Sequence, residues 1–121
     1  MTLLNYLGHL PLIPRFLYWI IVHMSFAIPM KRINETATLT AFFHPVASYS
    51  THILIVPKQA VAGLEEANKL SSAFWVDLVR TVQALVAEFD LEQIGYRLIV
   101  NGGKYQEFPY LHFHLVSGKE E

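Results

Sequence analysis

Residues 110–116 (YLHFHLV) alternate between apolar side chains and side chains that can form hydrogen bonds. Successive side chains of a β-strand point to opposite faces of the sheet. One face of this strand would carry Leu111, Phe113 and Leu115. The other face would carry Tyr110, His112, His114 and Val116, with the two imidazoles ~7 Å apart at the usual rise of a strand. The pattern therefore predicts a sheet with an apolar core on one side and polar groups on the other.

A second regular pattern lies upstream and has the period of a helix. Apolar residues recur every three or four positions, at Leu70, Phe74, Leu78, Val82, Leu85 and Phe89. This spacing predicts an amphipathic α-helix of about five turns, with Ser71 or Ser72 as its N-terminal cap. A shorter helix is expected just before it, at residues 64–69.

Three further segments are expected to be strands because β-branched and aromatic side chains are frequent in them. They are residues 39–43 (LTAFF), 52–56 (HILIV) and 96–100 (YRLIV). Short connections between consecutive strands favour antiparallel pairing. The expected fold class is therefore α+β, an antiparallel sheet with one long helix, followed by a short polar tail at residues 118–121.

The N-terminal region is the least typical part of the chain. Residues 16–30 (FLYWIIVHMSFAIPM) carry no charge, but a membrane-spanning helix needs about 20 apolar residues. We expect residues 1–25 to be an extension with an apolar helix, packed on the main domain at residues 26–121 or in a dimer contact. Peripheral membrane contact through residues 10–30 is the alternative.

Composition narrows the class of protein. A length of 121 residues suits one domain, and 53% hydrophobic residues suffice for a core. The net charge of −1 gives no basic surface, which argues against nucleic acid as a partner. The absence of cysteine excludes disulfides and Cys-based zinc sites, and it fits a cytoplasmic protein.

The two histidines of residues 110–116 allow three interpretations. They are half-buried structural residues, or ligands of a metal ion that also needs His44, His52 or Glu107. In the third interpretation, one neutral imidazole attacks phosphorus while a neighbour orients its other nitrogen.

The wider sequence favours the third interpretation, because it resembles the histidine-triad (HIT) family from about residue 26 to residue 118. The family signature alternates three histidines with apolar residues, and residues 110–116 match it except that Tyr110 takes the place of the first histidine. The likeness lies in residues 28–44, 51–58, 97–103 and 106–116. It implies a homodimer that binds a nucleotide or phosphate ligand and needs no metal or cofactor.

The resemblance also implies roles for individual residues of the triad strand and its support. His112 takes the position of the nucleophile, which forms a nucleotidyl-histidine that water then hydrolyses. His114 takes the position that contacts the phosphate, and His52 that of a histidine supporting the triad. The implied activity is that of a nucleotide phosphohydrolase or nucleotidyl transferase.

Other positions imply contacts with the nucleotide. Phe43 and His44 match residues that line the nucleoside pocket, and Leu54 lies on the strand beside it. Asn101 matches an asparagine that touches the ribose or phosphate. Gln106 matches the glutamine that opens the phosphate-side loop.

Three residues depart from the family pattern. Tyr110 replaces the first histidine of the triad, and a phenol with a pKa near 10 cannot carry positive charge as imidazole does. Pro45 replaces an aspartate that holds ribose hydroxyls in nucleotide-hydrolysing members. Glu107 replaces a serine near the leaving group. These departures keep open the alternative of a phosphate-binding module with weak or no turnover.

Overall fold

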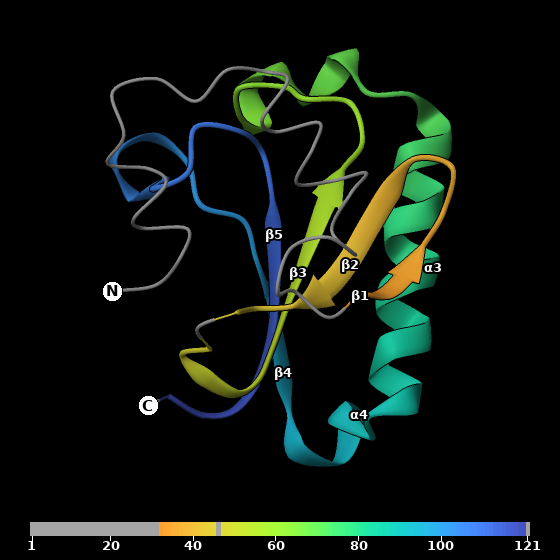
Figure 1. Ribbon diagram of the computed structural model, residues 1–121, viewed down its shortest axis with the longest axis vertical. Coiled ribbons are helices and arrows are strands. Elements are labelled where there is room, and N and C mark those ends of the chain that lie inside the picture. Colours follow the sequence, from red (N-terminus) through yellow and green to blue (C-terminus); the bar gives the residue numbers. More distant parts are fainter. Residues whose placement is uncertain (1–31, 46, 121) are drawn as a thin grey trace.

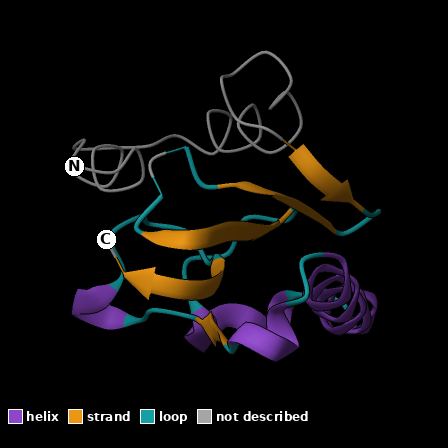
Figure 2. Ribbon diagram, turned by 90° about the horizontal axis from the view of Figure 1, so that it is seen from below, coloured by secondary structure: helices purple, strands orange, loops and turns teal. Residues whose placement is uncertain are grey.

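The computed structural model describes residues 32–45 and 47–120. They form one five-stranded antiparallel sheet in the order β1-β2-β3-β5-β4, with the long helix α3 on one side of it (Figures 1 and 2). The elements are β1 (Arg32–Glu35), β2 (Leu39–Phe43), β3 (Tyr49–Pro57), the 3₁₀ helix η2 (Leu64–Lys69), α3 (Ser72–Glu88), α4 (Leu91–Ile94), β4 (Tyr96–Ile99), the 3₁₀ helix η3 (Gly103–Tyr105) and β5 (Phe113–Glu120). The predicted α+β class with one long helix is confirmed.

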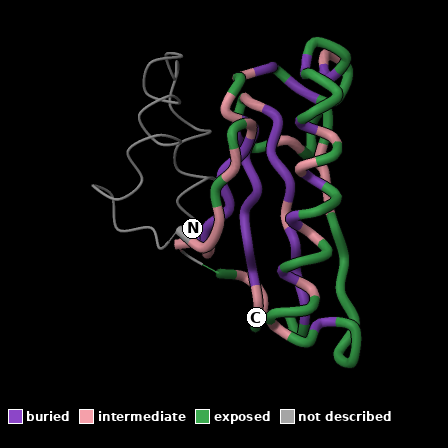
Figure 3. Tube along the Cα trace, turned by 90° about the vertical axis from the view of Figure 1, so that its right-hand side faces the viewer, coloured by how far each residue is buried: buried purple, intermediate pink, exposed green. Residues whose placement is uncertain are grey.

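Helix α3 begins at the predicted cap and packs through the predicted stripe. The side chain of Ser71 accepts a hydrogen bond from the backbone N–H of Phe74 at 3.3 Å. Phe74, Leu78 and Leu85 are buried against the sheet, whereas the outward residues of the helix are exposed (Figure 3). Burial of each such side chain contributes about 1.5–3 kcal/mol to stability.

The centre of the sheet is the pair β3 and β5. In their register Ile55 lies opposite Phe113 and Leu54 lies opposite His114. Directly opposed residues of an antiparallel pair share a face. Ile55 and Phe113 belong to the core cluster under α3, so alternation turns Leu54 and His114 to the other side of the sheet.

Two strands differ from the sequence-based expectation. The edge strand β1 was not predicted, because Ile33 is the one apolar residue in its four positions. The expected polar tail instead continues β5 as far as Glu120. Gly118 permits this path: its φ is +84°, and a Cβ there would lie 2.7 Å from the side chain of Ser50.

The expected N-terminal helix and the boundary at residue 25 lie outside the described residues. Within the described part of the chain, no helix has the length and apolar character needed to cross a bilayer.

Candidate active site

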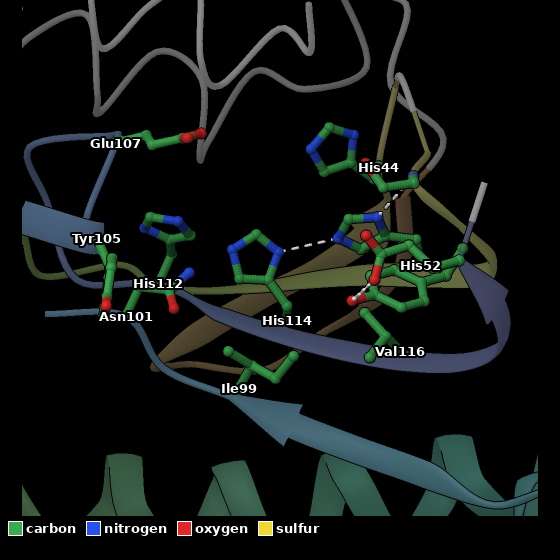
Figure 4. A pocket seen from close by; sticks show the side chains of 12 residues that line it. His44, His52, Ile99, Asn101, Tyr105, Glu107, His112, His114 and Val116 are labelled. Atoms are coloured by element: carbon green, nitrogen blue, oxygen red, sulfur yellow. Dashed lines mark hydrogen bonds between the residues drawn. The ribbon is translucent and has the colours of Figure 1, made fainter.

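A cavity of about 360 Å³ lies beside the His112 and His114 side chains. His114 lies on β5 and faces the cavity from the side of the sheet opposite to α3. His112, which immediately precedes β5, faces the same cavity (Figure 4). The described residues that line the cavity are His44, Ser48, Tyr49, His52, Ile99, Asn101, Tyr105, Glu107, His112, His114, Val116 and Glu120. The chain therefore brings four imidazoles to one cavity.

One backbone contact defines the tautomer of His112. Its Nδ1 atom lies 2.8 Å from the carbonyl oxygen of Tyr110. A carbonyl oxygen only accepts hydrogen bonds, so Nδ1 carries the proton and Nε2 of the neutral ring keeps its lone pair. The edge-on ring of Phe108, with centroids 5.8 Å apart, packs against the same imidazole. The ring is thus held with one defined nitrogen available for chemistry.

The charge state of His112 follows from its surroundings. Burial lowers the pKa of His112, because the imidazolium ion loses hydration. The Tyr110 carbonyl and the Glu107 carboxylate act in the opposite direction and stabilise the charged form. The balance keeps the ring neutral near pH 7, as a nucleophile requires.

A second set of contacts defines the tautomer of His114. The backbone N–H of Ser48 donates to Nδ1 of His52 at 3.1 Å, so the proton of neutral His52 is on Nε2. That Nε2 lies 2.9 Å from Nδ1 of His114 and donates to it (Figure 4). His114 consequently carries its own proton on Nε2.

Burial also keeps these two rings neutral. It lowers the pKa of His52. For His114, burial and then the neighbouring imidazoles of His112, His52 and His44 lower the pKa to about 3. The centroids of the His112 and His114 rings are 4.9 Å apart. The pair therefore offers one nitrogen lone pair and one N–H donor side by side, which suits attack on a phosphoryl group and binding of its oxygens.

Further lining residues extend the cavity beyond the triad strand. His44 stacks on His52 with centroids 4.4 Å apart, and the ring of Tyr49 meets His52 edge-on at 5.5 Å. The hydroxyl of Tyr49 donates to the carboxylate of Glu120 at 3.2 Å. Asn101 and Glu107 lie at the opposite end, beside His112 (Figure 4).

Six lining residues were not among the expected site residues: Ser48, Tyr49, Ile99, Tyr105, Val116 and Glu120. Val116 follows from alternation with His114, and Ile99 follows from the register, in which it lies opposite His114. Of the other four, Ser48 lies in a loop, Tyr49 begins β3, Tyr105 ends η3 and Glu120 ends β5, and the sequence carries no signal for these positions.

Four residues that the resemblance placed at the site do not line the cavity. The ring of Phe43 packs edge-on against that of Phe89, with centroids 5.6 Å apart, and against the core under α3. Leu54 lies opposite His114 in the register of β3 and β5, where its side chain is buried. The side-chain amide of Gln106 donates hydrogen bonds to the carbonyl oxygens of Ala62 and Phe108, at 2.7 and 3.0 Å.

The fourth of these residues, Tyr110, contributes through its main chain. Its carbonyl oxygen orients His112, whereas its ring packs edge-on against Phe108 with centroids 5.8 Å apart. Replacement of the family's first histidine therefore leaves this backbone contact in place.

No group of three or more His, Asp or Glu side chains in the described residues is arranged to hold a metal ion. The four imidazoles instead pair and stack with one another.

Comparison with known proteins places this geometry in a family context. The HIT domain family matches residues 25–121. A HIT-like protein of Synechococcus elongatus, itself uncharacterised, is 35% identical over 94 residues, which cover 76% of this chain and 82% of that protein. An adenosine 5′-monophosphoramidase of Candida albicans is 28% identical, over 78% of this chain and 65% of its own length. The crystal structure of a HIT family hydrolase from Legionella pneumophila superposes with a TM-score of 0.73 at 27% identity, covering 86% of this chain and 93% of that one.

Proposed function

This chain belongs to the HIT domain family, and from that premise we propose that it is a nucleotide phosphohydrolase or nucleotidyl transferase. Its substrate is a nucleoside phosphoramidate or phosphate ester, and His112 is its nucleophile. The hydrogen bond of 2.8 Å between Nδ1 of His112 and the Tyr110 carbonyl oxygen carries this proposal, because it leaves Nε2 unprotonated.

The first chemical step forms a covalent intermediate. The lone pair of His112 Nε2 forms a bond to phosphorus while the bond from phosphorus to the leaving group breaks. The leaving group departs with that electron pair and takes a proton from solvent. Nδ1 of His112 keeps its proton, and the Tyr110 carbonyl stabilises the positive charge that the phosphorylated ring acquires.

The second step releases the nucleotide. A water molecule attacks phosphorus, the bond to Nε2 breaks, and its electron pair returns to His112. The proton that the water loses goes to solvent, which balances the proton taken up in the first step. With an alcohol or amine in place of water, the same step is a nucleotidyl transfer.

Donors around the phosphoryl group stabilise the charge that develops on its oxygens. His114 donates from Nε2, because His52 occupies its Nδ1. We propose that the side chain of Asn101 donates from the His112 end and that His44 contacts the nucleoside. Loss of one such donor costs about 2.7–4 kcal/mol in other enzymes.

Some of the proposed binding residues act indirectly. Phe43 and Leu54 shape the sheet beneath the nucleoside, and Gln106 holds the loop that carries Glu107. Tyr110 positions His112 through its carbonyl oxygen.

We also propose that the protein is a homodimer formed through the β4 edge of the sheet. Among the described residues β4 pairs only with β5, and its residues Tyr96 and Leu98 are 47% and 42% exposed. An uncovered edge strand with large apolar side chains favours association with another strand.

Turnover of adenosine phosphoramidates and dinucleotides tests the enzymatic proposal. We expect His112→Asn to abolish turnover while its thermal unfolding stays close to that of the native chain. Mass spectrometry of the native protein, quenched during turnover, should detect a nucleotidyl group on His112. A His112→Asn variant with the native rate would disprove covalent catalysis at this residue.

The alternative is a module that binds a phosphate ligand without reacting. The carboxylate of Glu107 in the cavity favours it, because a carboxylate repels a phosphate. Nucleotide binding together with the absence of any covalent adduct and any turnover would establish this alternative.

A further inference from the structure

Glu107 is an exposed residue at the His112 end of the cavity, and both of its sequence neighbours are anchored. Its neighbour Gln106 is anchored to the carbonyl oxygens of Ala62 and Phe108, and its other neighbour Phe108 is buried against the His112 ring. The backbone of Glu107 is thereby held on both sides. Its side chain lines the cavity, and Figure 4 shows it extending above His112.

The charges of the cavity are unbalanced. The twelve described lining residues include two carboxylates, Glu107 and Glu120, and neither lysine nor arginine. Burial lowers the pKa values of His52, His112 and His114, so these rings add no positive charge near pH 7. The Glu120 carboxylate accepts a hydrogen bond from Tyr49 at the His52 end. Glu107 is therefore the negative charge that a substrate meets beside the nucleophile.

A substrate at His112 has a phosphoryl group and two substituents on it. One is the nucleoside, which carries no positive charge near neutral pH, and the other is the leaving group. A phosphoryl anion close to Glu107 is repelled by it, and a positive charge on the substrate removes that penalty. The nucleoside cannot supply this charge, whereas an amine leaving group with a second, protonated amino group can.

We propose that Glu107 is a specificity residue that selects substrates whose leaving group bears a positive charge. The substrate class is a nucleoside phosphoramidate of a diamine or another amine with a second, protonated amino group. The reacting amine leaves from phosphorus, and its distant ammonium pairs with the Glu107 carboxylate. This inference rests on the proposed function and specifies its leaving group.

The test uses two adenosine phosphoramidates that differ in one charge. One is made from a diamine with four methylene groups, and the other from pentylamine, in which a methyl group replaces the ammonium. Dissociation constants are measured by calorimetry on His112→Asn protein, which cannot react. We expect tighter binding of the ammonium compound by about tenfold, which corresponds to ~1.4 kcal/mol.

The Glu107→Gln change in the same background should abolish this preference. The matched control is Glu120→Gln, which removes the same charge from the other end of the cavity and should leave the preference intact. Equal binding of the two compounds by the His112→Asn protein that retains Glu107 would overturn the inference. A preference that survives Glu107→Gln would also overturn it, as would failure of both compounds to bind at millimolar concentration.

Turnover of the same two compounds by the native chain separates this inference from the proposed function. If the native chain turns over neither compound and the binding preference is present, the proposed catalysis is refuted and the proposed role of Glu107 stands. Turnover of both compounds at the same kcat/KM, together with equal binding, would leave catalysis standing and refute the role of Glu107.

Discussion

Nε2 of His52 lies 2.9 Å from Nδ1 of His114, and this contact determines which nitrogen of His114 faces the cavity with a proton. His52 can act as the donor because the backbone N–H of Ser48 occupies its other nitrogen at 3.1 Å. His112 has the complementary tautomer, since a carbonyl oxygen holds the proton on its Nδ1. Two neighbouring neutral imidazoles therefore carry their protons on opposite nitrogens, as the proposed roles of donor for His114 and nucleophile for His112 require.

Replacement of His52 tests this assignment. His52→Leu removes the donor to His114, so either nitrogen of His114 can carry the proton, and we expect kcat to fall by about tenfold or more. His52→Gln keeps an N–H that can reach His114 and should recover much of the rate. Equal rates for the two variants, with both chains folded, would show that the contact between His52 and His114 does not orient the donor.

Activity should depend on pH through His112, the residue proposed to attack phosphorus. Protonation of His112 removes its lone pair, so activity is present above its pKa and declines as the pH falls through it. Because burial lowers this pKa, kcat/KM should hold its plateau to a pH below 6.5, the usual pKa of a histidine. The control is Glu107→Gln, which removes an interaction that raises the pKa of His112 and should move the acidic limb to lower pH. An acidic limb above pH 6.5 would contradict the assignment.

Stability should show a related dependence on pH. The pKa of His114 is about 3 in the folded chain and near 6.5 in the unfolded chain, so the unfolded state binds more protons between these values. The free energy of unfolding should therefore decrease as the pH falls below 6.5, with His114 contributing up to ~1.4 kcal/mol per pH unit. Urea denaturation at several pH values measures this slope. His114→Asn should reduce it, and an unchanged slope would argue that His114 is not buried as a neutral ring.

The cap of helix α3 offers a matched pair of variants. Ser71 accepts the hydrogen bond from the Phe74 N–H, whereas Ser72 is the exposed first residue of the helix. We expect Ser71→Ala to lower the free energy of unfolding by about 1 kcal/mol. Ser72→Ala should change it by less than half as much. Equal losses in denaturation experiments would mean that the cap contributes little.

The elements that could be predicted from the sequence are those in which side-chain periodicity and burial agree. Leu111, Phe113 and Leu115 pack into the core under α3, as their alternation predicts. Phe74 and Leu85 of the predicted apolar stripe of α3 likewise belong to the core. β1 escaped prediction because an edge strand with one apolar residue depends on its pairing partner. Its turn is closed by Thr36, whose backbone N–H donates to the Leu39 carbonyl oxygen at 2.9 Å.

The site shows a similar limit. Alternation brings His112 and His114 to one side of the chain, and the register of β4 adds Ile99 opposite His114. The orientation of His52 could not be predicted, because it depends on a backbone N–H of Ser48 four residues earlier in a loop. The position of Glu120 in the cavity lining could not be predicted for a different reason. Its position depends on a glycine with positive φ that extends β5 beyond the last periodic residue.

The exposed edge of β4 leads to a prediction about assembly. Tyr96 and Leu98 lie on this strand and are 47% and 42% exposed, and Ile94, which ends α4 just before the strand, is 62% exposed. A lysine on an edge strand opposes pairing with another strand, so Leu98→Lys should convert the proposed dimer to a monomer in sedimentation velocity experiments. Val76→Lys is the matched control, because Val76 is 48% exposed on α3, away from the sheet edge, and should leave the dimer intact. A dimer that persists in Leu98→Lys, or one that dissociates equally in both variants, would exclude the β4 edge as the interface. A native chain that sediments as a monomer would exclude the dimer itself.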